Sequence, residues 1–349
     1  MCNYSDIIQA VRRLSKGEEA GPDISDILYR HRCNYLLSLT KDKKYLKTLA
    51  YEKFLSKMAV KERYKALTPF FENTDINYAV IKGAVLSLCA YNDPYLRVSG
   101  DIDILIDKKD SDKIKKELKA LGFIQGRVTD RGIIPFSREE ILFQTSMTHQ
   151  TAPYVKETGN RLCPYVNIDI NTDIMWGESR KKTDMTVFLQ YSTVIQINDF
   201  IVKKLLPEAE FISLCMHHYK DFNSLYLLSK RGFCLGQYCD IYFYLKNMKP
   251  SVSRLQALSE QLKVGEYIYY CLYYTDLIFD DEDIKLYLLA FEKDKDETLL
   301  SSFGLCEDER KRWECGFFER IFSHDVNELL KDKLTQHDLE KIQIIQILM

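Results

Sequence analysis

The sequence has little that would place the chain in a membrane or along a nucleic acid. No stretch approaches the roughly 18 consecutive apolar residues that a membrane-spanning helix needs. Its 49 Lys and Arg residues are balanced by 51 Asp and Glu residues, which gives a formal net charge of −2. A polybasic field of the kind that drives non-specific binding to DNA or RNA is therefore lacking. We expect no membrane association, and we regard a nucleic-acid partner as disfavoured.

Two further features are missing. The N-terminal segment, which begins MCNYSDIIQAVRR, becomes charged too early for a secretory signal. None of the ten cysteines has C-x-x-C spacing, and several lie in apolar segments. We therefore expect a cytoplasmic protein with buried free thiols. Zinc is disfavoured because the spacing matches no usual finger in the downstream Cys and His residues, which are Cys215, His217, His218, Cys234 and Cys239.

The chain is long enough, at 349 residues, to favour more than one domain. Helical periodicity dominates the first part, with a Ser5 cap expected at SDIIQAVRRL, and it returns after Pro207. Short β-rich runs lie between them. We predict an α+β fold in which a mixed sheet with helices is flanked by helical regions. The expected divisions are an N-terminal helical region (1–75), a catalytic core (76–206) and a C-terminal helical domain (207–349).

The predicted core contains a short series of strands and helices. The run INYAVIKG (76–83) reads as a strand, and AVLSLCAY continues as a helix. The segment DIDILID reads as a second strand, which SDKIKKELKALGF follows as an amphipathic helix. After a less regular stretch, PYVNIDINTDIMW (164–176) reads as a strand, and TVIQINDFIVKKL as a hairpin that turns at Asn198-Asp199.

Two aspartates stand at the head of the second strand. Side chains of a strand alternate between faces, so Asp101 and Asp103 are expected on one face, about 6–7 Å apart at Cα. Two carboxylates at this spacing can bind a hard divalent cation, and with a third carboxylate they suit phosphoryl transfer. The alternative is that both acids lie at a strand end in water.

The residues around the two aspartates favour the first interpretation. Gly83 closes a strand and opens a helix, a geometry that lets backbone N–H groups face phosphate oxygens. Lys82 stands beside it, and Arg97, Ser99 and Gly100 precede Asp101. Lys82 and Arg97 could contact a triphosphate; otherwise both are solvated surface residues.

The stretch IKGAVLSLCAYNDPYLRVSGDIDILID resembles the nucleotidyltransferase superfamily, whose fold is shared with DNA polymerase β. It is most similar to a little-characterised bacterial family with a Lys-Gly turn and an R-x-x-G-D-x-D motif. The resemblance implies that Asp101 and Asp103 hold Mg²⁺ or Mn²⁺ and that Gly83 belongs to the phosphate turn. It also implies that Asp169, in NIDIN, is the third carboxylate, which binds a second metal and helps to deprotonate the acceptor.

The chain departs from this family at two places. Relatives often have His where this chain has Asn171. The usual turn is Gly-Gly or Gly-Ser and lies closer to the D-x-D motif, whereas Gly83 is followed by Ala84 and lies 18 residues before Asp101. Any role for position 171 is therefore open, and the phosphate cradle can differ from that of the superfamily.

Several other residues have two interpretations. Asp173 is the second choice for the third acid, and His149 is read as a hydrogen-bonded structural histidine. Asp240 could pair with Arg231 or reach the active-site cleft. The roles of His217 and His218 stay open. The basic run SRKKTD (179–184) is a solvated loop or a contact for phosphates or acceptor.

The leading hypothesis is a Mg²⁺-dependent enzyme that transfers a nucleoside monophosphate from an NTP, releasing pyrophosphate. Its acceptor would be a hydroxyl or similar group on a small molecule, peptide or protein. The alternative is a nucleotidyltransferase-like fold kept as an inactive nucleotide-binding or regulatory module. A transferase directed at nucleic acid is disfavoured by the net charge. The sequence leaves open which NTP is used and what the oligomeric state is.

Overall fold

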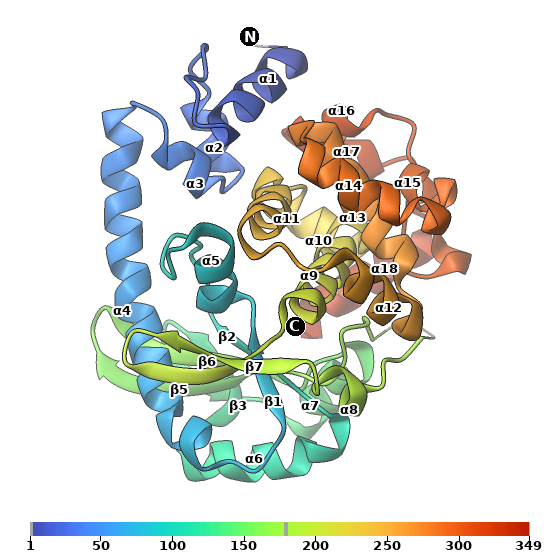
Figure 1. The fold of residues 1–349 in the computed structure, drawn as a ribbon. Helices are drawn as coiled ribbons and strands as arrows, with labels where there is room; N and C mark the ends of the chain where they lie inside the picture. Colours follow the sequence, from blue (N-terminus) through green and yellow to red (C-terminus); the bar gives the residue numbers. More distant parts are fainter. Residues whose placement is uncertain (1–2, 178–180, 349) are drawn as a thin grey trace. The chain divides into compact units, whose positions relative to one another are not determined.

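The computed structural model describes residues 3–177 and 181–348 (Figure 1). The chain forms two compact units. Of the described residues, unit 1 contains 3–50 and 214–347, and unit 2 contains 51–177, 181–213 and Leu348. The boundaries fall inside two helices, α4 (Lys43–Asn73) and α9 (Pro207–Asn223). The three consecutive regions expected from the sequence stay a prediction as domains. The compact units differ from them because the first 50 residues belong with the C-terminal helices.

Unit 2 is built on a mixed sheet. Within its described residues the strands are β1 (Tyr78–Ile81), β2 (Ile102–Ile106), β3 (Ile124–Thr129), β4 (Gly132–Pro135), β5 (Tyr154–Asn160) and β6 (Cys163–Asn171). The strand order is β1-β2-β6-β5-β3-β4. Only β2 and β6 pair in parallel; the other neighbours are antiparallel. The hairpin β7 (Ser192–Ile197) and β8 (Phe200–Leu205) turns at Asn198, as expected, and β8 lies beside β1.

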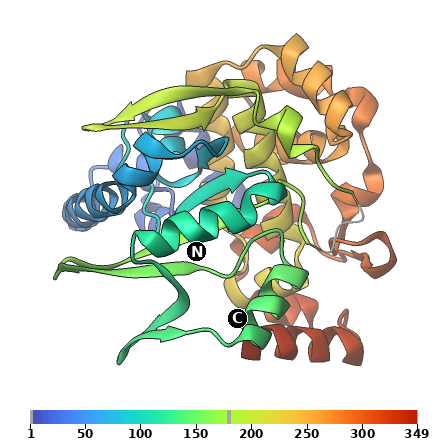
Figure 2. The same ribbon diagram turned by 90° about the horizontal axis from the view of Figure 1, so that it is seen from below.

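Helices complete unit 2. They are residues 51–73 of α4, α5 (Gly83–Tyr91), the 3₁₀ turn η1 (Lys108–Asp110), α6 (Ser111–Ala120), α7 (Arg138–Met147), α8 (Met185–Phe188) and residues 207–213 of α9. Helix α6 buries Ile114 and Leu118 at helical spacing and lies in front of the central strands in Figure 2. Strands β1 and β2 are buried along their whole length, which explains their continuous apolar character.

Unit 1 is helical apart from a two-stranded ladder. Its elements are α1 (Tyr4–Ser15), α2 (Ser25–Arg30), α3 (Asn34–Ser38), α10 (Leu225–Arg231), α11 (Leu235–Met248), α12 (Val252–Leu262), α13 (Gly265–Phe279), α14 (Glu282–Ala290), η2 (Glu292–Asp294), α15 (Glu297–Ser301), β9 (Ser302–Phe303), η3 (Glu307–Glu309), β10 (Lys311–Arg312), α16 (Phe317–Phe322), α17 (Val326–Leu330) and α18 (Gln336–Leu348). Tyrosines of α13 form core contacts, and Tyr274 stacks on Phe317 at 4.1 Å between ring centroids. They are therefore packing residues.

The expected fold class, α+β with a mixed sheet and flanking helices, is confirmed. Three details differ. The cap of α1 is Asn3, whose side chain accepts from the backbone N–H of Asp6, and not Ser5. Asp101 precedes β2 and does not lie within it. The irregular stretch contains β3, β4 and β5, whose exposed residues leave little apolar alternation to detect.

Two further expectations concern the cysteines and the apolar character of the helices. The nine cysteines in the described part of the chain are free thiols, as expected, and six of them are buried. Across the described residues, no helix combines the length and apolar character needed to cross a bilayer.

Candidate active site

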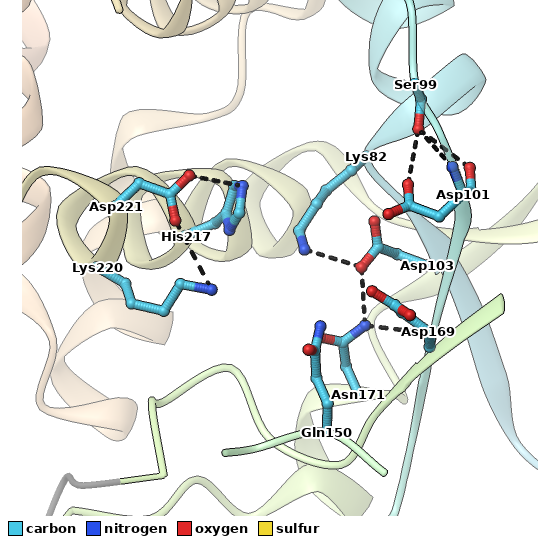
Figure 3. A network of polar contacts seen from close by, with 10 residues as sticks. All are labelled: Lys82, Ser99, Asp101, Asp103, Gln150, Asp169, Asn171, His217, Lys220 and Asp221. Atoms are coloured by element: carbon cyan, nitrogen blue, oxygen red, sulfur yellow. Dashed lines mark hydrogen bonds and ion pairs between the residues drawn. The ribbon is translucent and has the colours of Figure 1, made fainter. Parts of the chain in front are cut away.

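Two of the predicted acids meet on neighbouring strands of unit 2. Asp103 of β2 is the register partner of Asp169 of β6 in the parallel pair. Residues in register on adjacent strands project to the same face, with strands about 4.7–4.9 Å apart. The two carboxylates therefore lie side by side (Figure 3). Asp103 is only 6% exposed, whereas Asp169 is half-buried. Two adjacent acids are unfavourable unless positive charge is supplied.

Asp103 receives that charge from Lys82. The ammonium Nζ of Lys82 lies 2.9 Å from Asp103 Oδ1. The same oxygen accepts a hydrogen bond from Asn171 Nδ2 at 3.1 Å, and Gln150 Nε2 donates to Asn171 Oδ1 at 2.9 Å. Asn171 is fully buried. Asn171, which stands where relatives often have His, therefore orients Asp103. Its spacing of two residues from Asp169 on a strand was the signal that could have found it.

Asp101 is held by a different set of contacts. Ser99 Oγ donates to Asp101 Oδ1 at 2.8 Å, and Arg63 Nη1 donates to the backbone carbonyl of Ser99 at 2.8 Å. Arg63 lies on α4 and was not singled out from the sequence. No local pattern connects it with a motif 36 residues downstream, so only the fold identifies it.

The backbone at the Lys-Gly turn is strained. Lys82 has φ 55° and ψ −149°, a region that residues with a side chain rarely adopt, and Gly83 has φ 45°. Such a residue costs on the order of 1–3 kcal/mol and is found mainly at functional sites. A Cβ added to Gly83 would lie 3.7 Å from Ser99 Oγ. The turn therefore directs Lys82 towards Asp103 and brings the start of α5 close to Ser99.

A small pocket of unit 2 collects most of the predicted nucleotide-binding residues. Its lining includes Lys82, Gly83, Arg97, Ser99 and Asp101, together with Arg63 from α4. Gly100 is exposed in the loop between Ser99 and Asp101 and does not line the pocket. Burial lowers the pKa of Arg63, but a guanidinium keeps its charge at neutral pH. Three cationic side chains around one pocket suit an anionic ligand.

The carboxylates have the donor chemistry that Mg²⁺ prefers, which is oxygen. Among the described residues, however, no group of three or more His, Cys, Asp or Glu side chains is arranged to hold a metal ion. Lys82 Nζ lies against Asp103 where a cation would bind. Oδ2 of Asp103 makes no hydrogen bond to another described residue. Asp103 and Asp169 therefore fit a divalent cation once the ammonium turns away, and the metal role of Asp101, Asp103 and Asp169 stays a prediction.

Asp173 does not join this set. Strand β6 ends at Asn171, and the Asp173 carboxylate accepts from the backbone N–H groups of Met175 and Thr183. Burial raises the pKa of Asp173, against the effect of these bonds. It is a loop-stabilising residue in this structure. His149 lies beside the end of β6, where its carbonyl accepts from Thr172.

The downstream histidines belong to unit 1. His217 lies 3.5 Å from Asp221 one helical turn later, and His218 Nε2 lies 3.8 Å from Asp240 Oδ2. His218 and Asp240 are both buried. The sequence left open whether Asp240 pairs with Arg231 or reaches the active-site cleft, and the structure places it beside His218. Residues 179 and 180 of the basic run lie outside the described residues.

The comparisons with known proteins concern the family and the fold of the chain. The family model described as "Uncharacterised nucleotidyltransferase" matches residues 24–280, and the chain belongs to this family. No curated protein matches. One solved structure, the crystal structure of an antigenic nucleotidyltransferase-like protein from Paracoccidioides brasiliensis, is 16% identical and covers 68% of this chain and 92% of its own. Its TM-score is 0.35.

Proposed function

We propose that the protein is a Mg²⁺- or Mn²⁺-dependent enzyme that transfers a nucleoside monophosphate from an NTP to an acceptor hydroxyl or similar group. One observation carries this proposal: Asp103 and Asp169 lie in register beside the strained Lys82-Gly83 turn. Paired acids next to a pocket lined by three cationic side chains are a costly arrangement that a purely structural strand edge would not need.

Each residue of the site has a role that follows from its position. Lys82 and Arg97 contact the triphosphate, and Gly83, Ser99 and Gly100 shape the loops that receive it. A divalent cation at Asp101, Asp103 and Asp169 would neutralise the phosphates and polarise the α-phosphorus. Asp169 accepts the proton of the acceptor hydroxyl while the new oxygen–phosphorus bond forms and pyrophosphate leaves.

The acceptor is proposed to be a small molecule, peptide or protein. A protein that follows a nucleic-acid backbone neutralises several phosphates with a concentrated basic surface. The balance of 49 basic and 51 acidic residues supplies no such excess.

A second candidate function has an observation of its own. The Lys82–Asp103 ion pair already neutralises one acid, and that arrangement would suit a nucleotide-binding or regulatory module without catalysis. Such a module would bind NTP with or without divalent cation and would release no pyrophosphate.

One experiment separates the two. The protein is incubated with each α-labelled NTP, Mg²⁺ and a cell extract, and label is followed in small-molecule, protein and nucleic-acid fractions. Transfer that Asp101→Asn plus Asp103→Asn removes supports the enzyme. NTP binding without pyrophosphate release, for all four nucleotides, supports the inactive module. Label in the nucleic-acid fraction would overturn the proposed acceptor class.

A further inference from the structure

Arg63 holds the loop that carries Asp101. Its residue is only 8% exposed, and Nη1 donates to the Ser99 carbonyl at 2.8 Å and, less closely, to the Asp101 carbonyl at 3.4 Å. Neither residue lies in β2, so the sheet ladder does not fix either carbonyl. The guanidinium therefore supplies a donor to the Ser99 carbonyl, whereas the Asp101 carbonyl also has Ser99 Oγ at 3.0 Å.

Ser99 connects this backbone contact with the carboxylate. Its hydroxyl donates to Asp101 Oδ1 at 2.8 Å, and its Oγ lies near Gly83 across the pocket. A shift of the Ser99 backbone moves the hydroxyl and with it the preferred direction of the Asp101 carboxylate. Oδ2 of Asp101 makes no hydrogen bond to another described residue. That oxygen is the one available to a cation.

We propose that Arg63 is a positioning residue that sets the orientation of Asp101 through Ser99. This inference rests on the proposed function, because orientation of Asp101 matters only if Asp101 binds a cation. Residues that orient a metal ligand typically change metal affinity by 10–100-fold when they are replaced. Arginine suits the task because its planar guanidinium stays charged and holds its N–H groups in fixed directions, here with Nη1 facing both carbonyls, whereas lysine offers a single point charge.

A purely structural Arg63 would behave differently. In that case its loss would lower the melting temperature of unit 2 but leave metal affinity of the folded protein unchanged. Arg12 of unit 1 provides a matched control, since its Nε and Nη2 donate to the carbonyls of Ile278 and Leu277 at 2.8 and 2.9 Å. It donates to two backbone carbonyls as Arg63 does, differs in also pairing with Asp280 at 3.6 Å, and belongs to unit 1.

The test is calorimetric titration of Mn²⁺ with a non-hydrolysable ATP analogue, well below the melting temperature of each variant. We expect Arg63→Met to weaken Mn²⁺ binding about 10-fold. Arg63→Lys should recover part of this loss, and Arg12→Met should bind as the wild type does. Ser99→Ala should weaken binding to a similar degree. Adding Arg63→Met to Ser99→Ala should bring little further loss, since both act on the same carboxylate.

The outcomes are distinguishable. Mn²⁺ affinity of folded Arg63→Met within twofold of wild type overturns the inference and leaves the proposed function standing. Losses in Arg63→Met and Ser99→Ala that multiply in the double variant overturn the route through Ser99. Wild-type protein that binds no Mn²⁺ in the presence of the analogue refutes the proposed enzyme, and the inference falls with it.

Discussion

Unit 2 contains two buried lysine–carboxylate pairs that differ in their surroundings. Lys82 and Asp103 are 2.9 Å apart, with side chains 12% and 8% exposed. Lys204 and Glu210 are 2.6 Å apart, with side chains 6% and 4% exposed. The chemistry of the pairs is the same. Their neighbours decide whether the pair can be exchanged for another cation.

The second pair, Lys204 and Glu210, is called the closed pair here because both partners are tied to the surrounding fold. Lys204 Nζ also donates to the carbonyl of Leu205, and Glu210 stands in the first turn of α9. Burial lowers the pKa of Lys204, but the charge and hydrogen bond of Glu210 outweigh it, and the pKa lies above its usual value. Burial raises the pKa of the adjacent Cys89 thiol to about 12, so it stays neutral. This pair serves to stabilise the fold.

The first pair, Lys82 and Asp103, is called the open pair here because its surroundings differ. Asp103 has a second acid, Asp169, beside it in register, and one lysine does not neutralise both. Lys82 occupies a strained backbone position and lines the pocket. A buried lysine–carboxylate pair therefore indicates function when a second carboxylate stands next to the first.

The largest expected effect is a loss of unfolding free energy when the closed pair is broken. Lys204→Met leaves Glu210 charged and buried without its partner, and loss of one member of such a pair costs about 3–5 kcal/mol of unfolding free energy. Chemical denaturation monitored by circular dichroism measures the loss. Addition of Mg²⁺ should not restore it.

The control for this prediction is the double variant Lys204→Met/Glu210→Leu. Apolar replacement of a whole buried pair is often neutral, so most of the stability should return. A double variant as unstable as Lys204→Met would show that the pair is not the source of the effect.

The second prediction concerns Asp169 and Asp173. Asp169→Asn should keep its fold and most NTP affinity but lose at least about 100-fold in nucleotidyl transfer, the lower end of the range for a general base. Asp173→Asn should retain transfer, because the Asp173 carboxylate accepts hydrogen bonds from backbone N–H groups of a loop and does not belong to the site. Steady-state release of pyrophosphate measures both. Full activity in Asp169→Asn with loss in Asp173→Asn would reverse the assignment.

The third prediction tests the open pair. Lys82→Met should lower stability by about 1–3 kcal/mol, the cost of an unsatisfied partner. Unlike Lys204→Met, it should be stabilised again by Mg²⁺, by about 2.7 kcal/mol when the cation is at 100 times its dissociation constant. NTP affinity should fall by about 1–3 kcal/mol. Lys82→Arg, which keeps the charge, is the control. A Lys82→Met protein indifferent to Mg²⁺ would place both pairs in the same structural class.

The parts of the site that could be predicted from the sequence are those encoded locally. The strand–Gly83–helix turn and Asp103 of β2 follow from the glycine and from strand alternation, whereas Asp169 of β6 was implied by the family resemblance. The end of β6 at Asn171 explains why Asp169 is in the sheet and Asp173 is not. These assignments need only a few consecutive residues.

The rest depends on contacts between distant segments. Register of β2 with β6 joins residues 66 positions apart, as in Asp103 and Asp169, and no sequence pattern specifies that alignment. Arg63 lies inside a 31-residue helix in which nothing marks it as different from a surface cation. The positive φ of Lys82 arises from the packing of the turn and not from a residue that favours it.

Unit 1 offers the opposite case, a buried titratable group that is held neutral. Burial lowers the pKa of His31 from 6.5 to about 4, with further contributions from Arg30 and His324. Its Nδ1 accepts the backbone N–H of Leu235 at 3.4 Å, which requires an unprotonated nitrogen. Among the described residues, no carboxylate forms an ion pair with His31 as Asp103 does with Lys82, so protonation of the ring is unfavourable in the folded protein.

The last and smallest prediction follows from that difference. The unfolded chain binds a proton at His31 below pH 6.5, whereas the folded protein does so only near pH 4. Stability should therefore fall as the pH is lowered through this window, by about 1 kcal/mol between pH 6.5 and 5.5. His31→Gln, measured by urea denaturation at both pH values, should remove this part of the pH dependence. Replacement of the exposed His337 by Gln should leave it unchanged. Equal slopes in wild type and His31→Gln would mean that His31 is protonated in the folded protein and that the contrast with the paired lysines does not hold.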